Sequence, residues 1–140
     1  MIPNRSVPEA SVIPELAYDD VAAAAEWLCD AFGFTKRLRI GNHRMQLVFG
    51  DGALIVIERG DAAGQEGSLT HAVLVRVEDA DRHHEQAVTH GARILSPPTD
   101  FPYGERQYNA EDLGGHRWTF SQSIADVDPA SWGGELASAD

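Results

Sequence analysis

The chain has 140 residues and a mass of 15.2 kDa, the usual size of one domain. Acidic residues outnumber basic ones and give a net charge of −11, which disfavours nucleic acid and anionic membranes and favours a neutral or cationic small molecule as partner. The single cysteine, Cys29, excludes an internal disulfide framework and a zinc cluster built on cysteines. Since no apolar run is long enough for a membrane span and the first ten residues lack the apolar core of a secretory signal, we expect a cytoplasmic protein without a membrane segment.

The first half of the chain predicts a strand, a helix and three further strands. Residues 11–18 form a short mixed run that ends at Asp19 and Asp20, and either aspartate can cap the helix that follows. Apolar residues recur at helical spacing over residues 21–32, and Gly33 ends this helix. Three short runs then follow as strands joined by glycine-containing turns: 36–40, 43–49 and 53–58.

The second half repeats this order. Residues 69–77 read as a strand, residues 80–90 as a helix, and Gly91 takes the place that Gly33 has in the first half. Three more predicted strands follow: 92–95, 105–110 and 116–121. We therefore predict a single α+β domain over residues 1–140, built from two βαβββ repeats that form curved mixed sheets. The repeats span about 11–59 and 69–122, and a tail, 123–140, is anchored by Trp132.

Five blocks of sequence carry a resemblance to a known superfamily. They read AYDDV, WLCDAFGF, VEDAD, PYGERQY and DLGGHRWTF, at residues 17–21, 27–34, 77–81, 102–108 and 112–120. Together with the duplicated unit, they resemble the vicinal oxygen chelate superfamily, in its glyoxalase and bleomycin-resistance branch. The resemblance implies that each sheet curls with its helix on the convex side and the ligand on the concave side. It implies no single activity, because this scaffold carries isomerases, epimerases, dioxygenases, thiol transferases and drug binders.

Enzymes of the superfamily hold one divalent metal on the concave side, and the resemblance assigns four ligand positions to this chain. Counting back seven residues from the aspartates that open the two helices gives Ile13 and Ala72. Counting four residues on from the glycines of the two hairpins gives Val56 and Thr119. None of these side chains is a good ligand for a divalent ion, apart from the weak hydroxyl of Thr119. We therefore expect no metal, no other cofactor and no catalytic residue.

A displaced metal site is the alternative. If Phe49 opposes Gly52 in the first hairpin, His43 lies across from Glu58, and this pair could act as acid and base or as half of a metal site. An exposed ion pair is the simpler interpretation. His71 lies one residue from a ligand position, and because strand side chains alternate faces it points away from the concave side unless a bulge intervenes.

The expected pocket combines an apolar floor with a polar rim. In the second hairpin, a register with Asp112 opposite Gly115 places Tyr108 across from Thr119 and Arg106 on the same face, while Tyr103 closes over the pocket mouth. The expected lining comprises Ile13, Glu15, Met45, Leu54, Val56, Ala72, Tyr103, Arg106, Tyr108, Arg117 and Thr119. The histidines of the second helix are expected on its solvated face: His83, His84 and His90.

These features favour a metal-free binding protein that sequesters a drug or metabolite. The alternatives are a lyase, epimerase or dioxygenase that binds zinc, nickel, manganese or iron at a displaced site of His43, Glu58 and His71, and a ligand-sensing or structural module. The resemblance also implies a homodimer, because pockets of the superfamily are commonly built from paired units of two chains.

Overall fold

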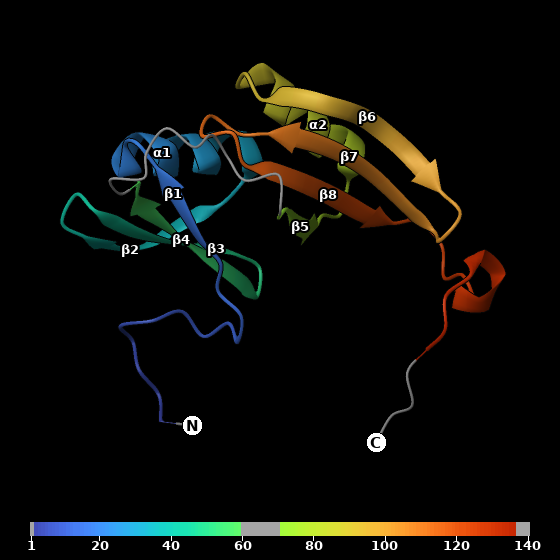
Figure 1. Cartoon of the computed structure of the whole chain (residues 1–140), viewed down its shortest axis with the longest axis horizontal. Helices are drawn as coiled ribbons and strands as arrows, with labels where there is room; N and C mark the ends of the chain where they lie inside the picture. Colours follow the sequence, from blue (N-terminus) through green and yellow to red (C-terminus); the bar gives the residue numbers. More distant parts are fainter. Residues whose placement is uncertain (1, 60–70, 137–140) are drawn as a thin grey trace.

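The structure, a computed structural model, describes residues 2–59 and 71–136, which form two four-stranded sheets with one helix on each (Figure 1). The elements of unit 1 are β1 (Glu15–Tyr18), α1 (Val21–Phe32), β2 (Thr35–Ile40), β3 (Arg44–Phe49) and β4 (Gly52–Glu58). Those of unit 2 are β5 (Val73–Arg76), α2 (Ala80–Thr89), β6 (Arg93–Phe101), β7 (Glu105–Glu111) and β8 (Arg117–Ser123). The strand orders are β1-β4-β3-β2 and β5-β8-β7-β6, with β1 parallel to β4 and β5 parallel to β8. The predicted fold of two βαβββ units is confirmed.

The helices begin where the sequence places their caps. Of the two candidates before α1, Asp20 is the cap, since its side chain accepts a hydrogen bond from the backbone N–H of Ala23. Gly33 ends α1 with a φ of 88°, a conformation that favours glycine. Asp79 caps α2 in the same way as Asp20 caps α1.

The core lies between the helices and the sheet faces that they cover. Strands of both units contribute fully buried side chains to it, and α1 adds Leu28 and Phe32. Phe32 packs against the rings of Trp118 and Phe120, so helix α1 of unit 1 contacts the sheet of unit 2. Because both helices lie on the same side of the molecule, the opposite faces of the two sheets remain for other contacts (Figure 1).

The first hairpin has the predicted register, and the second does not. Phe49 opposes Gly52, as predicted. In the second hairpin Tyr108 opposes Phe120, and Asn109 takes the place opposite Thr119 that the sequence predicted for Tyr108. The prediction was wrong because Asp112 pairs with His116 across the turn instead of with Gly115.

The shifted register moves two predicted pocket residues to the helix side. Tyr108 is fully buried, stacks on Phe120 and shares a hydrogen bond with His83 of α2. Arg106 forms ion pairs with Asp100 of β6 and Asp81 of α2. Neither side chain faces the concave side.

His83 is partly buried between the two units, which corrects the expectation of a solvated position. Its Nε2 lies 2.8 Å from the carbonyl oxygen of Phe32, so this nitrogen donates, and Nδ1 accepts from the Tyr108 hydroxyl. Burial lowers the pKa of His83 below its ordinary value of 6.5.

We expect this lowered pKa to make the fold sensitive to acid. Because the unfolded chain takes up a proton at His83 more readily than the folded chain does, stability is full above about pH 6.5 and is lost as the pH falls below it. Urea unfolding of wild type and His83→Gln between pH 7.5 and 5 measures this loss. The variant should show a smaller decline, whereas His90→Gln should behave as wild type. Equal slopes for His83→Gln and wild type would contradict the assignment.

Asp112 holds the two units together. Its Oδ1 accepts from the backbone N–H groups of Gly114 and His116, and its Oδ2 accepts from Trp118 Nε1 and from the Tyr18 hydroxyl at 2.6 Å. Burial, followed by the nearby Asp112 charge, raises the pKa of Tyr18, so this hydroxyl stays protonated and donates. A carboxylate from the β7–β8 turn thus joins β1 of unit 1 to β8 of unit 2.

Replacing Asp112 by asparagine should therefore weaken the fold. An amide has one accepting atom where the carboxylate has two, so a buried donor loses its partner and stability falls by roughly 1–3 kcal/mol. Denaturant unfolding gives the value directly. The matched control is Asp19→Asn, since Asp19 is exposed and lies 3.9 Å from Arg59; a loss as large in this control would refute the special role of Asp112.

Candidate functional site

The concave face, defined here as the side of each sheet that points away from α1 and α2, is polar in unit 2. Thr119 donates to Asn109, which donates to Ser96. Nearer the β6–β7 turn, Gln107 donates to Ser121, and Ser121 donates to Glu105 at 2.7 Å. These side chains alternate with the core side chains along β7 and β8, so they lie on one face of the sheet, where Ser121 is itself buried.

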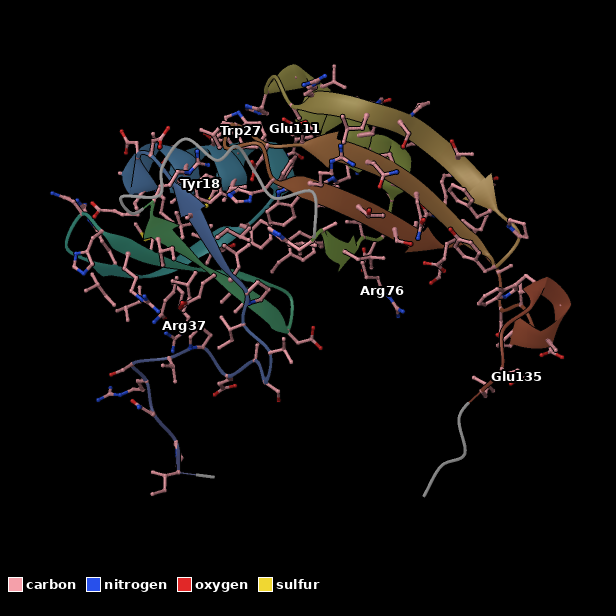
Figure 2. All side chains as sticks on the ribbon, viewed as in Figure 1. Tyr18, Trp27, Arg37, Arg76, Glu111 and Glu135 are labelled. Atoms are coloured by element: carbon pink, nitrogen blue, oxygen red, sulfur yellow. The ribbon has the colours of Figure 1, made fainter. Side chains whose placement is uncertain are left out.

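Glu105 is the acidic group of this surface. The hydrogen bonds from Ser121 and from Ser123 lower the pKa of its carboxyl below the ordinary value. Arg76 of β5 adds a smaller effect in the same direction and extends away from the helices (Figure 2). Glu105 therefore carries its negative charge at neutral pH and can attract a cationic group.

Three aromatic rings border this surface. Phe101 and Tyr103 stack with ring centres 5.4 Å apart and planes 7° apart, and Trp132 meets Tyr103 edge-on at 5.5 Å. Phe101 is 36% exposed and Trp132 is 45% exposed, so flat apolar surface is available beside Glu105. We call Phe101, Tyr103 and Trp132 the aromatic ledge. The Tyr103 hydroxyl also donates to Gln107 at 3.1 Å, which links the ledge to the polar side chains.

Gly104 fixes the ledge in place. Its φ is +84°, and a Cβ there would lie 2.4 Å from the carbonyl oxygen of Ala125. The backbone N–H of Ile124 donates to the Gly104 carbonyl oxygen at 2.8 Å. Only glycine allows the tail to pass this close, and the tail then brings η1 (Pro129–Trp132) against Tyr103.

The concave face of unit 1 is covered by the N-terminal residues. Gln46 donates to the carbonyl oxygen of Ser6 at 2.8 Å, and Arg37 donates to that of Arg5 at 3.0 Å. Gln46 is consequently only 2% exposed, and in Figure 1 the N-terminal segment passes below β2, β3 and β4. This contact could not be predicted from the sequence, because the segment has no periodic pattern.

The predicted pocket residues are distributed over several environments. Thr119 and Tyr103 lie on the concave face of unit 2, and Arg117 is exposed opposite Glu111. Ile13 and Ala72 precede β1 and β5, while Glu15 is held by an ion pair with Arg44. Three residues face the core: Met45, Leu54 and Val56.

Val56 is the clearest correction among the proposed metal-ligand positions. It alternates with Ile55 and Ile57 along β4, and it is fully buried on the helix side. The concave positions of this strand are therefore Ile55 and Ile57, which lie beside Glu15 and Ala17 of β1. In unit 2 the corresponding pairs are Leu74 with Thr119 and Arg76 with Ser121.

The concave positions of β1, β4 and β5 do not fit a divalent metal. Alkyl groups and a guanidinium cannot coordinate one, and Glu15, the carboxylate beside Ile55, is paired with Arg44 at 2.7 Å. Nor does the displaced site form: His43 lies over Gly41 at the β2–β3 turn, Glu58 ends β4, and His71 lies beside His116. Across residues 2–59 and 71–136, no group of three or more histidine, cysteine, aspartate or glutamate side chains could hold a metal ion.

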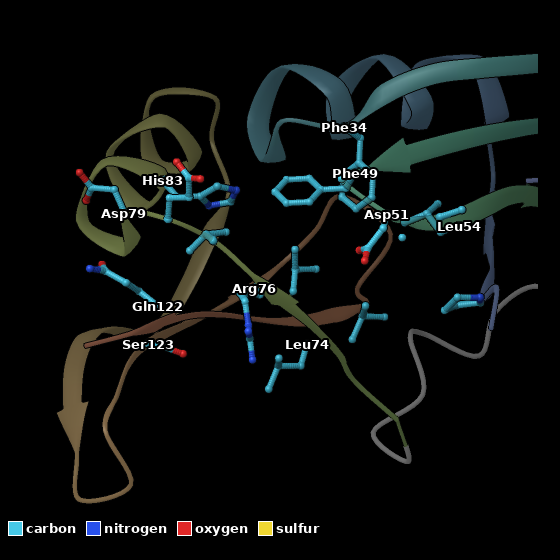
Figure 3. A pocket seen from close by; sticks show the side chains of 18 of the residues that line it. Phe34, Phe49, Asp51, Leu54, Leu74, Arg76, Asp79, His83, Gln122 and Ser123 are labelled. Atoms are coloured by element: carbon cyan, nitrogen blue, oxygen red, sulfur yellow. The ribbon is translucent and has the colours of Figure 1, made fainter. Parts of the chain in front are cut away.

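A cleft of about 1050 Å³ lies between the units, and Leu54 is its one lining residue that the sequence predicted. Phe34 and Phe49 form one wall, and Asp79, which caps α2, forms the other with His83 of α2 (Figure 3). Leu74 and Arg76 of β5 lie between these walls.

Comparison with known proteins identifies the family. The model of the Glyoxalase/Bleomycin resistance protein/Dioxygenase superfamily matches residues 12–120, and the chain belongs to this superfamily. Among solved structures, TioX from Micromonospora sp. ML1 is 34% identical, with a TM-score of 0.67, over 85% of this chain and 100% of that chain. A search of curated proteins found no match.

Two other solved structures support the fold alone. A glyoxalase-related enzyme from Fulvimarina pelagi is 18% identical, with a TM-score of 0.68, over 81% of this chain and 88% of that chain. Lactoylglutathione lyase from Agrobacterium tumefaciens is 18% identical, with a TM-score of 0.63, over 84% of this chain and 96% of that chain. Among the helices of the described residues, none is long and apolar enough to span a membrane.

Proposed function

We propose that this chain binds a flat, neutral or cationic organic molecule on the concave face of unit 2 and needs no divalent metal to do so. The observation that carries the proposal is the chemistry of the concave positions. On β5 of unit 2, Leu74 offers only alkyl groups and Arg76 offers a cation, and the corresponding residues of unit 1, Ile55 and Ile57, are also alkyl. These side chains offer no ligand to a divalent metal ion and suit an organic molecule.

The aromatic ledge and Glu105 supply complementary contacts for such a ligand. A flat ring can stack on Phe101 or Tyr103, whose planes are nearly parallel. A positively charged amine can pair with the ionised Glu105, and the net charge of −11 attracts cations to the protein as a whole. The proposed role is sequestration of a drug or metabolite, in the cytoplasm, where the Cys29 thiol stays reduced.

Replacing the ring of Tyr103 should weaken ligand binding. Titration calorimetry with metal-free bleomycin as the first probe, followed by a panel of flat cationic antibiotics, would be run in EDTA. Loss of a stacking contact of about 0.5–1.5 kcal/mol in Tyr103→Ala corresponds to roughly 2- to 12-fold weaker binding. Tyr103→Phe keeps the ring and should retain most of the affinity.

Two outcomes would contradict the proposal. One is binding that disappears in EDTA and returns with zinc or nickel, which would indicate a metal-dependent site. The other is a Tyr103→Ala variant with wild-type affinity for a probe that does bind, since the ligand would then lie elsewhere.

We further propose that the protein is a homodimer. Leu74, on the edge strand β5, is 62% exposed and borders the cleft between the units. A second copy placed against this edge would remove that apolar surface from water.

Light scattering at micromolar concentration should therefore give twice the mass of one chain. Leu74→Glu should shift the mass toward the monomer, because a charge would be buried at the contact. Leu113→Glu is the matched control, since Leu113 is also exposed but lies on the β7–β8 turn. A monomeric wild type would refute the dimer, and so would an equal effect of both substitutions.

A further inference from the structure

Among the described residues, one nitrogen of the His116 imidazole has a hydrogen-bond partner and the other has none. Its Nε2 lies 2.8 Å from the carbonyl oxygen of Ala17. A carbonyl oxygen can only accept, so Nε2 carries the proton. In the neutral ring, Nδ1 is then an unprotonated lone pair, available to a hydrogen-bond donor or to a metal ion.

This lone pair is buried without a partner. His116 is 6% exposed, and in the described part of the chain its Nδ1 has no hydrogen-bond partner. Buried polar atoms in folded proteins nearly always have a partner, so an isolated one points to a missing water, ion or ligand. The ring cannot turn away easily, because Tyr18 packs against it edge-on at 4.8 Å while Ala17 holds Nε2.

A second imidazole, that of His71, lies beside the His116 ring. The ring centres of His71 and His116 are 5.9 Å apart, with 49° between the planes. Two imidazoles that bind one zinc ion, each through a nitrogen at about 2.0–2.1 Å, have ring centres roughly 5 to 6.5 Å apart. His71 is exposed, so its side chain can adjust while His116 stays fixed.

We propose that His71 and His116 together bind one divalent cation of the borderline class, zinc, nickel or copper. These ions prefer imidazole nitrogen, and water completes the coordination. The hydrogen bond from Nε2 to Ala17 is the kind of outer contact that orients a metal-binding histidine. Arg59, the nearby cation, donates to the carbonyl oxygens of Ala17 and Gly114, so its guanidinium is already engaged by backbone acceptors.

This site is separate from the concave face. His71 precedes β5, His116 lies in the β7–β8 turn, and Ala17 belongs to β1, so a bound cation would tie both units at the junction that Asp112 already holds. A cation that binds only the folded chain stabilises it. The proposal does not depend on what the concave face binds.

Calorimetric titration of the full chain with zinc chloride, and separately with copper chloride, tests the pair. The informative variant is His71→Gln, because His71 is exposed and its loss should leave the fold intact. We expect its affinity for zinc to fall at least about tenfold. The matched control is His43→Gln, an exposed histidine at the β2–β3 turn, which should bind as wild type.

Two further measurements identify the ligands. Electron paramagnetic resonance of the copper complex should show coupling to two imidazole nitrogens in wild type and to one in His71→Gln. Zinc should raise the unfolding temperature of wild type and of His43→Gln, but not of His71→Gln. These shifts would be measured without any organic ligand.

The proposal is overturned if His71→Gln binds zinc as tightly as wild type, or if His43→Gln is weakened equally. It is also overturned if the copper spectrum of wild type shows a single nitrogen. Binding of an organic probe in EDTA, by contrast, should be the same for wild type and His71→Gln. Failure of the cation site and failure of the organic-ligand site are therefore observed in different experiments.

Discussion

The hydrogen bonds of the buried Asp112 carboxylate determine which residues form the ligand-binding face. By accepting from the backbone N–H groups of Gly114 and His116, it fixes a turn in which Asp112 pairs with His116. That pairing sets the register of β7 against β8, and a shift of one residue would exchange the two faces of the hairpin. Asn109 and Gln107 face outward, and Tyr108 faces the core, because of this turn.

The sequence predicted those structural elements whose signals lie in neighbouring residues. Helix caps, helix-ending glycines and the two-residue turn of the first hairpin each depend on neighbouring residues, and the elements that they delimit formed as predicted. The second register depended instead on which of two turn residues opposes Asp112. Glycine at 115 suggested one answer, but the side-chain hydrogen bonds of Asp112 and its contact with Tyr18, far away in the sequence, favour the other.

The remaining differences concern His83, Val56 and the N-terminal segment. His83 reads as a surface residue within α2, yet it lies against Phe32 of α1 and Tyr108 of β7. Val56 was assigned by counting along the chain, but alternation along β4 directs it to the helix. The N-terminal segment, which has no regular pattern, covers Gln46. The outcomes for His83 and Gln46 depend on partners that are distant in sequence, so no local pattern could reveal them.

The two units share one fold but present different surfaces on their concave sides. In unit 1 that side carries Ile55 and Ile57 together with Gln46 and Arg37, and these two polar side chains donate to the N-terminal segment. In unit 2 the hydroxyl and amide groups bond mainly to one another, and the aromatic ledge remains exposed. A duplicated scaffold can therefore hold one ligand on one unit only. The junction between the units, with Asp112, His71 and His116, has a different chemistry from both faces, and for this reason an organic ligand and a cation need not compete for the same atoms.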